Sequence, residues 1–347
     1  MRVTKKQALR LICALVFLVL CFTAAKISAT LAAGLDSQKA AERWAAGGEE
    51  DYAQISVFLS RDSGFTEESI SGISDTVDAA LVTASLKAEE DTRLWYSAYS
   101  TQIGEMELTG NRRNAASAVV TAVSGDFFTM HPMRLADGSY LKADDLMQDR
   151  VVLDTKLAWQ LFGSSEVSGM EVIVNDTPCL VAGVVQPETD GASQVAYGDK
   201  PRAYIPYALY DQLQTAGEGE SQWISCYEAV LPDPVRNFAK TTIENAISAG
   251  DGVHIVQNTE RYSLSHRWDT LRHLHDLMII PDSTAYPYWE NAARIREFDT
   301  AVLLGLELLL LIFPVIYGLR LLWKGYRFLE RFMAEKRKAH QRRFRTI

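Results

Sequence analysis

Two long apolar runs, one near each end of the chain, constrain this sequence more than any other feature. The first extends from Leu11 to Ala25 and is interrupted only by Thr23. A helix needs about 20 residues to cross ~30 Å of hydrocarbon, and residues 8–32 suffice if the Lys26 ammonium reaches the headgroups. A cleaved signal peptide would share the basic start and the apolar centre. Because no strict Ala-x-Ala triplet follows, we expect a retained membrane anchor.

The second run, from Ala301 to Trp323, contains only two charged residues, Glu307 and Arg320. Its length also suits a transmembrane helix. An intramembrane carboxylate is costly unless it is protonated or paired, so we expect Glu307 to face a neighbouring helix as a candidate intramembrane contact. Pro314 removes one backbone hydrogen bond, which predicts a kink within this span.

Aromatic residues lie on both sides of the second run. Such residues concentrate where a transmembrane helix meets water, so we interpret both groups as interfacial belts. The residues concerned are Tyr286, Tyr288, Trp289, Trp323, Tyr326 and Phe328.

Charge divides the chain into two basic ends and an acidic middle. Residues 34–299 hold 20 Lys/Arg against 41 Asp/Glu, a net charge of −21, whereas the whole chain carries −9. Basic flanks remain in the cytoplasm, so we expect both termini there and the middle outside. An acidic middle repels nucleic acid. The basic C-terminal tail could bind RNA, but topology and attraction to anionic membrane lipid are the simpler interpretation.

These patterns predict a protein of the cell's inner membrane with two spans and four segments. The segments are a cytoplasmic N-terminus with the first transmembrane helix at 1–33, an extracytoplasmic domain at 34–298, the second transmembrane helix at 299–324 and a basic cytoplasmic tail at 325–347.

Four cysteines are present. Cys13 and Cys21 belong to the first apolar run, and Cys179 and Cys226 belong to the middle. No two of them have the two-residue gap of a zinc or redox pair. In an extracytoplasmic domain Cys179 and Cys226 could form a disulfide. Two separate buried thiols are the simpler expectation, because the sequence does not show that their Cα atoms approach each other.

The middle begins with a first β-α-β unit. Residues 34–50 are expected to form a helix that leaves the membrane. Residues 52–60 alternate apolar and polar side chains, which is typical of a half-buried strand. Thr66 is a suitable N-cap for the helix that follows. Two further strands are expected at 92–103 and 117–124.

A second β-α-β unit follows roughly 100 residues later, which suggests a duplicated or two-lobed domain. Its expected elements are a strand at 223–231, a helix at 235–248, a strand at 253–256 and a further helix over about 260–279.

Between the two units the sequence predicts a compact β-rich lobe at about 125–200. Val151–Leu153 is a short apolar strand, and Asp154 is a good N-cap for the next helix. Gly163 suits the left-handed stop of that helix. The dipeptide Asn175-Asp176 is a hairpin turn.

Three segments of this region resemble the MacB-like periplasmic core domain of FtsX/MacB-type ABC transporter permeases. They are VVTAVSGDFFTMHPMRLADGSYL, VVLDTKLAWQLFGSSEVSGMEVIVND and PCLVAGVVQPE. The similarity rests on a Gly-acid-aromatic-Phe step, a helix ending in Leu161-Phe162-Gly163 and a hairpin ending in Val181-Ala182-Gly183-Val184-Val185.

The resemblance implies an α+β fold, namely an extracytoplasmic porter-like domain of two β-α-β lobes with an inserted β-rich lobe, flanked by two transmembrane helices. Permeases of that family carry two further C-terminal spans. This sequence ends at Ile347, 24 residues after Trp323, so we expect a member that lacks those two helices. It would then need a companion permease and an ATP-binding cassette subunit, and an extracytoplasmic adaptor could also contact it.

Catalytic motifs are absent from the sequence. It contains no Walker-type phosphate loop, no His-Glu-x-x-His and no Gly-x-Ser-x-Gly. His266, His273 and His275 cluster on one expected helix, but their spacing does not favour a metal site, which prefers histidines four residues apart. We therefore expect no enzymatic activity, no cofactor, no metal and no catalytic residue.

The family resemblance, the two apolar ends and the absence of catalytic motifs together favour a non-catalytic membrane component of an ABC-type export or envelope-remodelling system. Its outer domain would transmit conformational change or contact an extracytoplasmic partner. The alternative is a membrane-anchored sensor or ligand-binding module, which predicts a concave apolar pocket. A membrane-anchored enzyme with an unrecognised site ranks last.

Overall fold

The computed structural model describes residues 4–48, 51–88, 92–110, 114–215, 223–247, 252–277 and 285–344. Two compact units result, one of residues Ala33–Phe298 and one of the terminal segments Met1–Ala32 and Asp299–Ile347. The strands are β1 (Tyr52–Leu59), β2 (Tyr96–Gly110), β3 (Ala115–Gly125), β4 (Arg134–Gly138), β5 (Arg150–Asp154), β6 (Glu171–Val174), β7 (Thr177–Gln186), β8 (Arg202–Pro206), β9 (Cys226–Pro232) and β10 (Val253–Gln257).

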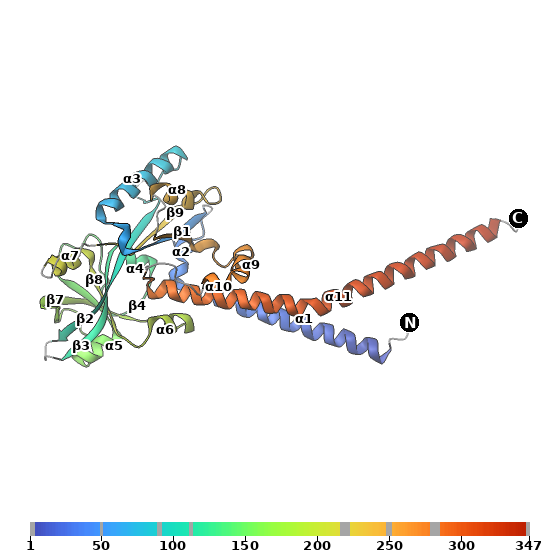
Figure 1. The fold of residues 1–347 in the computed structure, drawn as a ribbon, viewed down its shortest axis with the longest axis horizontal. Coiled ribbons are helices and arrows are strands. Elements are labelled where there is room, and N and C mark those ends of the chain that lie inside the picture. Colours follow the sequence, from blue (N-terminus) through green and yellow to red (C-terminus); the bar gives the residue numbers. More distant parts are fainter. Residues whose placement is uncertain are drawn as a thin grey trace. The chain divides into compact units, whose positions relative to one another are not determined.

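Helices connect these strands and form both ends of the chain (Figure 1). The α-helices are α1 (Lys5–Ala32), α2 (Ala40–Ala45), α3 (Glu67–Thr83), α4 (Phe127–Met130), α5 (Thr155–Phe162), α6 (Gly191–Tyr197), α7 (Tyr207–Thr215), α8 (Phe238–Ala246), α9 (Leu264–Arg272), α10 (Leu274–Leu277) and α11 (Tyr288–Phe344), and the short 3-10 turns are η1 (Asp36–Gln38), η2 (Arg61–Ser63) and η3 (Asn258–Glu260).

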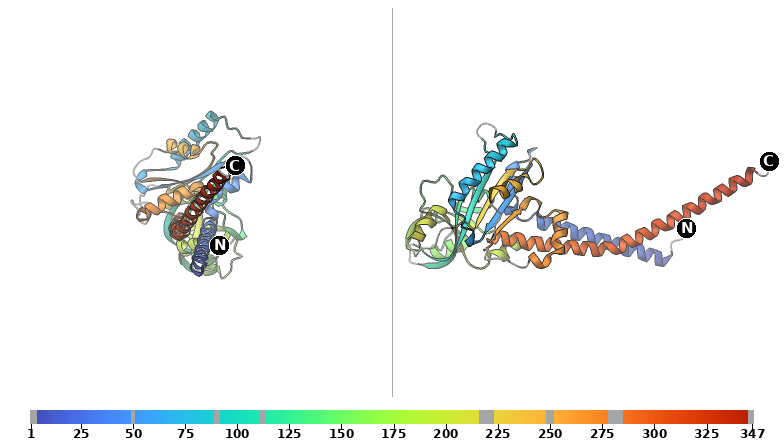
Figure 2. Two further views of the ribbon diagram at one scale, coloured as in Figure 1. Left: turned by 90° about the vertical axis from the view of Figure 1, so that its right-hand side faces the viewer. Right: turned by 45° about the horizontal axis from the view of Figure 1, so that its top comes forward.

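The outer unit is built on one hydrogen-bonded sheet with the strand order β10-β1-β9-β2-β3-β8-β5-β7-β4, and β6 pairs with β2 and β7. Each strand among the first four is antiparallel to its neighbours in the sheet. The units β1-α3-β2 and β9-α8-β10 therefore interleave as a split β-α-β pair, because β9 lies between β1 and β2. Helices α3 and α8 lie side by side over one face of this half-sheet (Figures 1 and 2). The two predicted β-α-β units and the α+β class are confirmed.

Strand β1 differs from the sequence prediction in its burial. It was expected to be half-buried, but every residue from Ala53 to Leu59 is buried. Ala53, Ile55, Val57 and Leu59 pack with residues of α3 and α8. Gln54, Ser56 and Phe58 point to the opposite face, which is also covered. Gln54 fits there because its amide donates to Ser37 O at 2.7 Å and accepts from Ala40 N at 3.0 Å. The alternation of side chains along β1 therefore directs them into two buried regions, one on each face of the sheet, and neither face is open to solvent.

The β-rich lobe is joined to the first half of the sheet by the long hairpin of β2 and β3. Strands β8, β5, β7 and β4 follow β3 in the sheet, and β8 is parallel to β3, whereas β6 pairs with β2 and β7. A bulge lies between Gln102 and Gly104 of β2, and Gly104 has φ 121°, a backbone angle that side chains with a Cβ rarely adopt.

Local signals inside this lobe act as the sequence predicts. Asp154 caps α5, since its Oδ1 accepts from Leu157 N at 2.7 Å. Gly163 ends the helix with φ 73°. Asn175 and Asp176 have φ 43° and 66° between β6 and β7, the left-handed pair that a two-residue hairpin requires. At Gly183, the glycine of the Val181–Val185 segment, an added Cβ would lie 2.4 Å from Ser139 O. A residue without a Cβ therefore lets the backbones at Gly183 and Ser139 approach closely.

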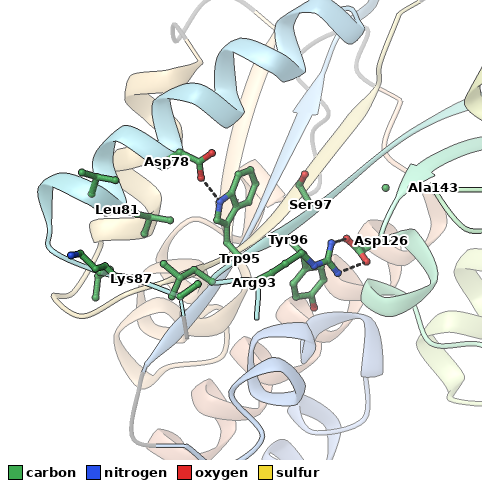
Figure 3. Close-up of a pocket in the computed structure, with 14 residues that line it drawn as sticks. Asp78, Leu81, Lys87, Arg93, Trp95, Tyr96, Ser97, Asp126 and Ala143 are labelled. Carbon is green, nitrogen blue, oxygen red and sulfur yellow. Dashed lines mark hydrogen bonds and ion pairs between the residues drawn. The ribbon is translucent and has the colours of Figure 1, made fainter. Parts of the chain in front are cut away.

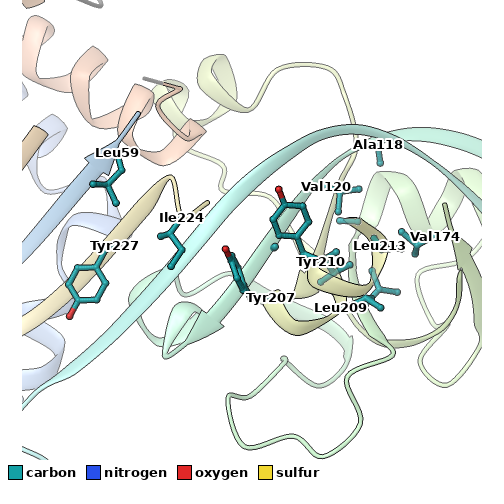
Figure 4. Close-up of a cluster of buried hydrophobic side chains, with 14 of the residues drawn as sticks. Leu59, Ala118, Val120, Val174, Tyr207, Leu209, Tyr210, Leu213, Ile224 and Tyr227 are labelled. Carbon is teal, nitrogen blue, oxygen red and sulfur yellow. The ribbon is translucent and has the colours of Figure 1, made fainter. Parts of the chain in front are cut away.

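Both halves of the outer unit share one hydrophobic core. A single cluster contains Leu59 and Tyr227 from the interleaved strands and Ile224 just before β9, together with Tyr207 and Leu213 from α7 (Figure 4). Burial of such large side chains contributes on the order of 2–3 kcal/mol each. The inserted lobe is consequently packed as a continuation of the domain.

Residues 34–50 were expected to form one helix leaving the membrane, and this prediction is wrong. Leu35 adopts an extended conformation and is buried, so the helix does not continue past the end of α1. Within the described residues 34–48, only η1 and the six residues of α2 are helical. Burial of Leu35 against Ala292 and Ala293 replaces the continued helix.

Among the described residues, two helices are long and apolar enough to cross a membrane, Lys5–Ala32 and Tyr288–Arg337. The terminal unit contains the first of them and the part of the second from Asp299 onward. Within this unit the Phe17 and Phe313 rings lie 5.6 Å apart, and Tyr317 OH donates to Gln7 O at 3.4 Å. Helix α11 continues through Pro314, and its axis changes direction about halfway along its length (Figure 1).

Candidate functional site

The first turns of α11 are fastened to the outer domain by a buried arginine. Arg261 follows η3, and its side chain is 3% exposed. Its Nη2 and Nη1 atoms donate to the two oxygens of Glu290 at 2.6 and 2.7 Å. Its Nε donates to Glu297 at 2.9 Å. A planar guanidinium suits this arrangement because its donors form a rigid fork.

Glu297 also binds helix α9. Its second oxygen accepts from Thr270 Oγ1 at 3.1 Å and lies 2.8 Å from His266 Nε2. Ser263 caps α9 by accepting from His266 N at 3.3 Å, which fixes the start of the helix. One carboxylate of α11 thus connects η3, α9 and the helix that enters the second apolar run.

Further hydrogen bonds continue from Arg261 into the sheet. Asn258 accepts from Arg261 at 3.4 Å and donates to Ser56 Oγ at 2.7 Å. Ser56 donates to Glu228 at 2.7 Å, and the other oxygen of Glu228 lies 2.5 Å from His131 Nε2.

We call this connected set the buried polar chain. Buried polar groups are costly unless they are bonded, so such a set holds its members in one arrangement. Its members are His131, Glu228, Ser56, Asn258, Arg261, Glu290 and Glu297, all buried.

Aromatic contacts run beside the buried polar chain. Tyr288 and Trp289 were interpreted as part of a membrane-interface belt, and that interpretation is wrong, because both are buried in a core cluster of the outer unit. The Trp289 ring lies 4.5 Å from the His131 ring and 5.4 Å from the Phe127 ring. These residues anchor α11 to the folded domain instead of to the lipid interface.

A cleft opens at the C-terminal end of α3 (Figure 3). It has a volume of about 700 Å³, within the range of small-molecule sites. We call it the α3 cleft. Its lining residues are Asp78, Leu81, Val82, Leu86, Lys87, Ala88, Arg93, Leu94, Trp95, Tyr96, Ser97, Gly125, Asp126 and Ala143.

The walls of the α3 cleft are held by polar side chains. The Trp95 indole donates to Asp78 at 2.8 Å, and Arg93 binds both oxygens of Asp126 at 2.9 and 3.0 Å. Hydrogen bonding to Asp126 raises the pKa of Arg93. Burial raises the pKa of Tyr96 to about 12, so its hydroxyl is neutral. The cleft can hold an apolar group beside a fixed indole.

Of the predicted site residues in the outer unit, Cys226 lies next to Glu228 of the buried polar chain, whereas Cys179 belongs to another hydrophobic cluster. Among the described residues, Cys179 and Cys226 are free buried thiols on β7 and β9, in different hydrophobic clusters, and the structure does not bring them together. Burial raises the pKa of Cys179 to about 11 and also raises that of Cys226. In the terminal unit, α1 is the neighbour of Glu307, since Cys21 Sγ lies 3.7 Å from the Glu307 carbonyl oxygen.

The three histidines are not gathered into a metal site, and no group of metal-ligating side chains occurs in the described ranges. His266 binds Glu297, whereas His273 contacts Asp269 O at 3.0 Å. The expected helix over 260–279 is interrupted at His273, between α9 and α10, and residues 278–279 lie outside the described residues. The sequence analysis did not single out Arg261, because its partners Glu290 and Glu297 lie 29 and 36 residues away in the chain.

This α+β domain, with an apolar helix at each end, belongs to a recognised class. The chain is a member of the MacB-like periplasmic core domain family, whose sequence model matches residues 18–241. It is 30% identical over 118 residues to the macrolide export ATP-binding/permease protein MacB of Acinetobacter baylyi, covering 33% of this chain and 17% of that protein. It is 34% identical over 94 residues to the MacB protein of Chromobacterium violaceum, covering 26% and 14%. The matches span less than a fifth of either relative.

Solved structures show weaker similarity. The periplasmic region of MacB from Actinobacillus actinomycetemcomitans is 17% identical, with a TM-score of 0.41, and the match covers 64% of this chain and 92% of that one. The extracellular domain of the noncanonic ABC-type transporter YknZ from Gram-positive bacteria is 14% identical, with a TM-score of 0.39, and covers 58% and 99%.

Proposed function

We propose that this chain is a non-catalytic membrane component of an ABC-type export or envelope-remodelling system. Its outer domain transmits conformational change between an extracytoplasmic partner and the membrane. Both termini are cytoplasmic, and the chain works with a companion permease and an ATP-binding cassette subunit. The family membership and the relatives' names support this reading.

The observation that carries the proposal is the buried polar chain. Movement of the central strands would be passed to α11 through bonded groups, because Arg261 links Asn258 to Glu290 and Glu297. A bonded, water-excluded set resists shear better than apolar contacts, which are non-directional. The domain would therefore shift its helix as one body.

The test is partner capture followed by a coupling measurement. The full chain, crosslinked in native membranes and purified in detergent, should carry an ATP-binding cassette protein with it. The substitution Arg261→Met should leave capture of the ATP-binding cassette protein intact. It should weaken the effect that outer-domain ligands or adaptors have on ATP hydrolysis by the captured subunit. The surface variant Arg236→Met should leave both readouts unchanged. Recovery of the chain only as a solitary monomer would contradict the proposal.

A second candidate function, a ligand-binding module, is favoured by the α3 cleft. An apolar ligand that fills it should raise the melting temperature of the full chain, as mass action requires for a ligand of the folded state. Trp95→Ala should abolish that shift, while Trp159→Ala, at an exposed tryptophan outside the cleft lining, should preserve it. If no member of a broad panel of apolar compounds gives a Trp95-dependent shift, this candidate fails.

A further inference from the structure

Helix α9 has one face that is fixed against the outer domain. Thr270 is buried, and both Thr270 and His266 bind Glu297 of α11. These two residues are four positions apart, so they share a face of the helix. The orientation of α9 about its own axis is thereby set.

The opposite face of α9 carries an unusual exposed set. Leu264 is 67% exposed and Trp268 is 42% exposed, and the Arg272 guanidinium lies over the Trp268 ring at 4.9 Å. Spacings of four residues place all three on one side. Arg267 and Asp269 flank this face on its two sides and carry opposite charges, so the face is apolar and aromatic with little net charge. We call it the Trp268 face.

Chain connectivity keeps α9 close to the second apolar run. Glu297, which binds α9, precedes Ala301 by four residues. Four residues reach at most ~14 Å even when fully extended, whatever the direction of the chain. The headgroup layers add about 5–8 Å of thickness on each side of the hydrocarbon. A segment bound to Glu297 is therefore within range of lipid headgroups.

We propose that the Trp268 face binds the headgroup region of phospholipids in the leaflet on the outer-domain side. Trp268 and Leu264 enter at the glycerol level, and Arg272 donates to lipid phosphates. Tryptophan suits this depth because its ring is apolar and its N–H is polar. The net charge of −21 over residues 34–299 opposes enrichment of anionic lipid, so the phosphate of a zwitterionic phospholipid is the partner.

Spin labelling of the full chain in phosphatidylcholine nanodiscs tests this proposal. A nitroxide is placed at Leu264→Cys and, as the matched control, at Val235→Cys, which is 70% exposed in the same domain. Wild type treated with the same reagent supplies the background from native cysteines. We expect the label at 264 to be more accessible to oxygen, and less accessible to a water-soluble nickel chelate, than the label at 235. Equal, water-like accessibility at both positions would overturn the proposal.

A label-free measurement guards against a nitroxide that inserts by itself. Nanodiscs containing phosphatidylcholine brominated near the headgroup should quench more tryptophan emission from wild type than from Trp268→Phe. The other tryptophans are common to both proteins, so the difference reports Trp268 alone. Identical quenching of the two proteins would contradict lipid contact at this helix, and it would leave the transport proposal unaffected.

Discussion

Replacing Arg261 by methionine is the sharpest perturbation of the buried polar chain. Methionine retains much of the apolar stem but removes the bonds donated to carboxylates, at 2.6 and 2.7 Å to Glu290 and 2.9 Å to Glu297, and also the bond to Asn258 at 3.4 Å. Two buried carboxylates then lose the guanidinium that pairs with both of them. Removing one partner of a buried ion pair costs about 3–5 kcal/mol. For a domain of this size each kcal/mol shifts Tm by ~2–4 °C, so we expect Tm to fall by roughly 6–20 °C.

The assay is thermal unfolding of the full chain in detergent, monitored by near-ultraviolet circular dichroism. Arg236→Met is the matched control, because Arg236 forms an exposed ion pair with Glu260 at 2.8 Å and exposed pairs contribute little. Adding Glu290→Gln and Glu297→Gln to Arg261→Met should recover part of the loss, since the uncompensated charges disappear. If Arg261→Met shifts Tm no more than Arg236→Met, the buried polar chain does not hold the domain together.

Three further outcomes test other groups of the outer domain. Burial raises the pKa of Glu188 above its ordinary value of 4.5, so its stabilising contribution is complete below that value and is lost as pH rises through the raised pKa. Wild type should therefore lose Tm relative to Glu188→Gln as pH increases from ~4 to ~8, and a constant difference would refute this. Asp154→Ala should cost roughly 2–5 kcal/mol in urea denaturation, because it removes a helix cap and the acceptor of Tyr197 OH and Arg202 N; a loss below that range would argue against the cap. Gly183→Ala should cost about 1–3 kcal/mol by the same measurement, since its Cβ would meet Ser139 O at 2.4 Å, and an unchanged midpoint would show that the crossing can relax.

Much of the local structure is predictable from short stretches of sequence. Asp154, Gly163 and the Asn175-Asp176 turn act within a few residues of themselves, so their chemistry is sufficient. The two β-α-β units follow from apolar periodicity, which also depends only on neighbours in the chain.

The functional features could not be predicted in this way, because they depend on distant segments. In the sequence, Ser56 stands at a position that faces solvent in a half-buried strand. Only the packing of α2, α4 and α11 shows that it is buried. Tyr288 and Trp289 have the composition of an interfacial belt next to an apolar run. Their burial depends on a cluster with residues of β2 and α4 that no local pattern reveals. The α3 cleft likewise combines Trp95 with Asp126 from another element.

The interleaved order of β10, β1, β9 and β2 has a consequence for biogenesis. Strand β9 must enter between β1 and β2, yet roughly 170 residues separate Leu59 from Cys226, which corresponds to ~10–30 s of synthesis. During that interval both inner edges of the first unit remain open to incorrect pairing. Holding the nascent chain at its N-terminal apolar helix would limit encounters with other chains until β9 arrives and closes the gap.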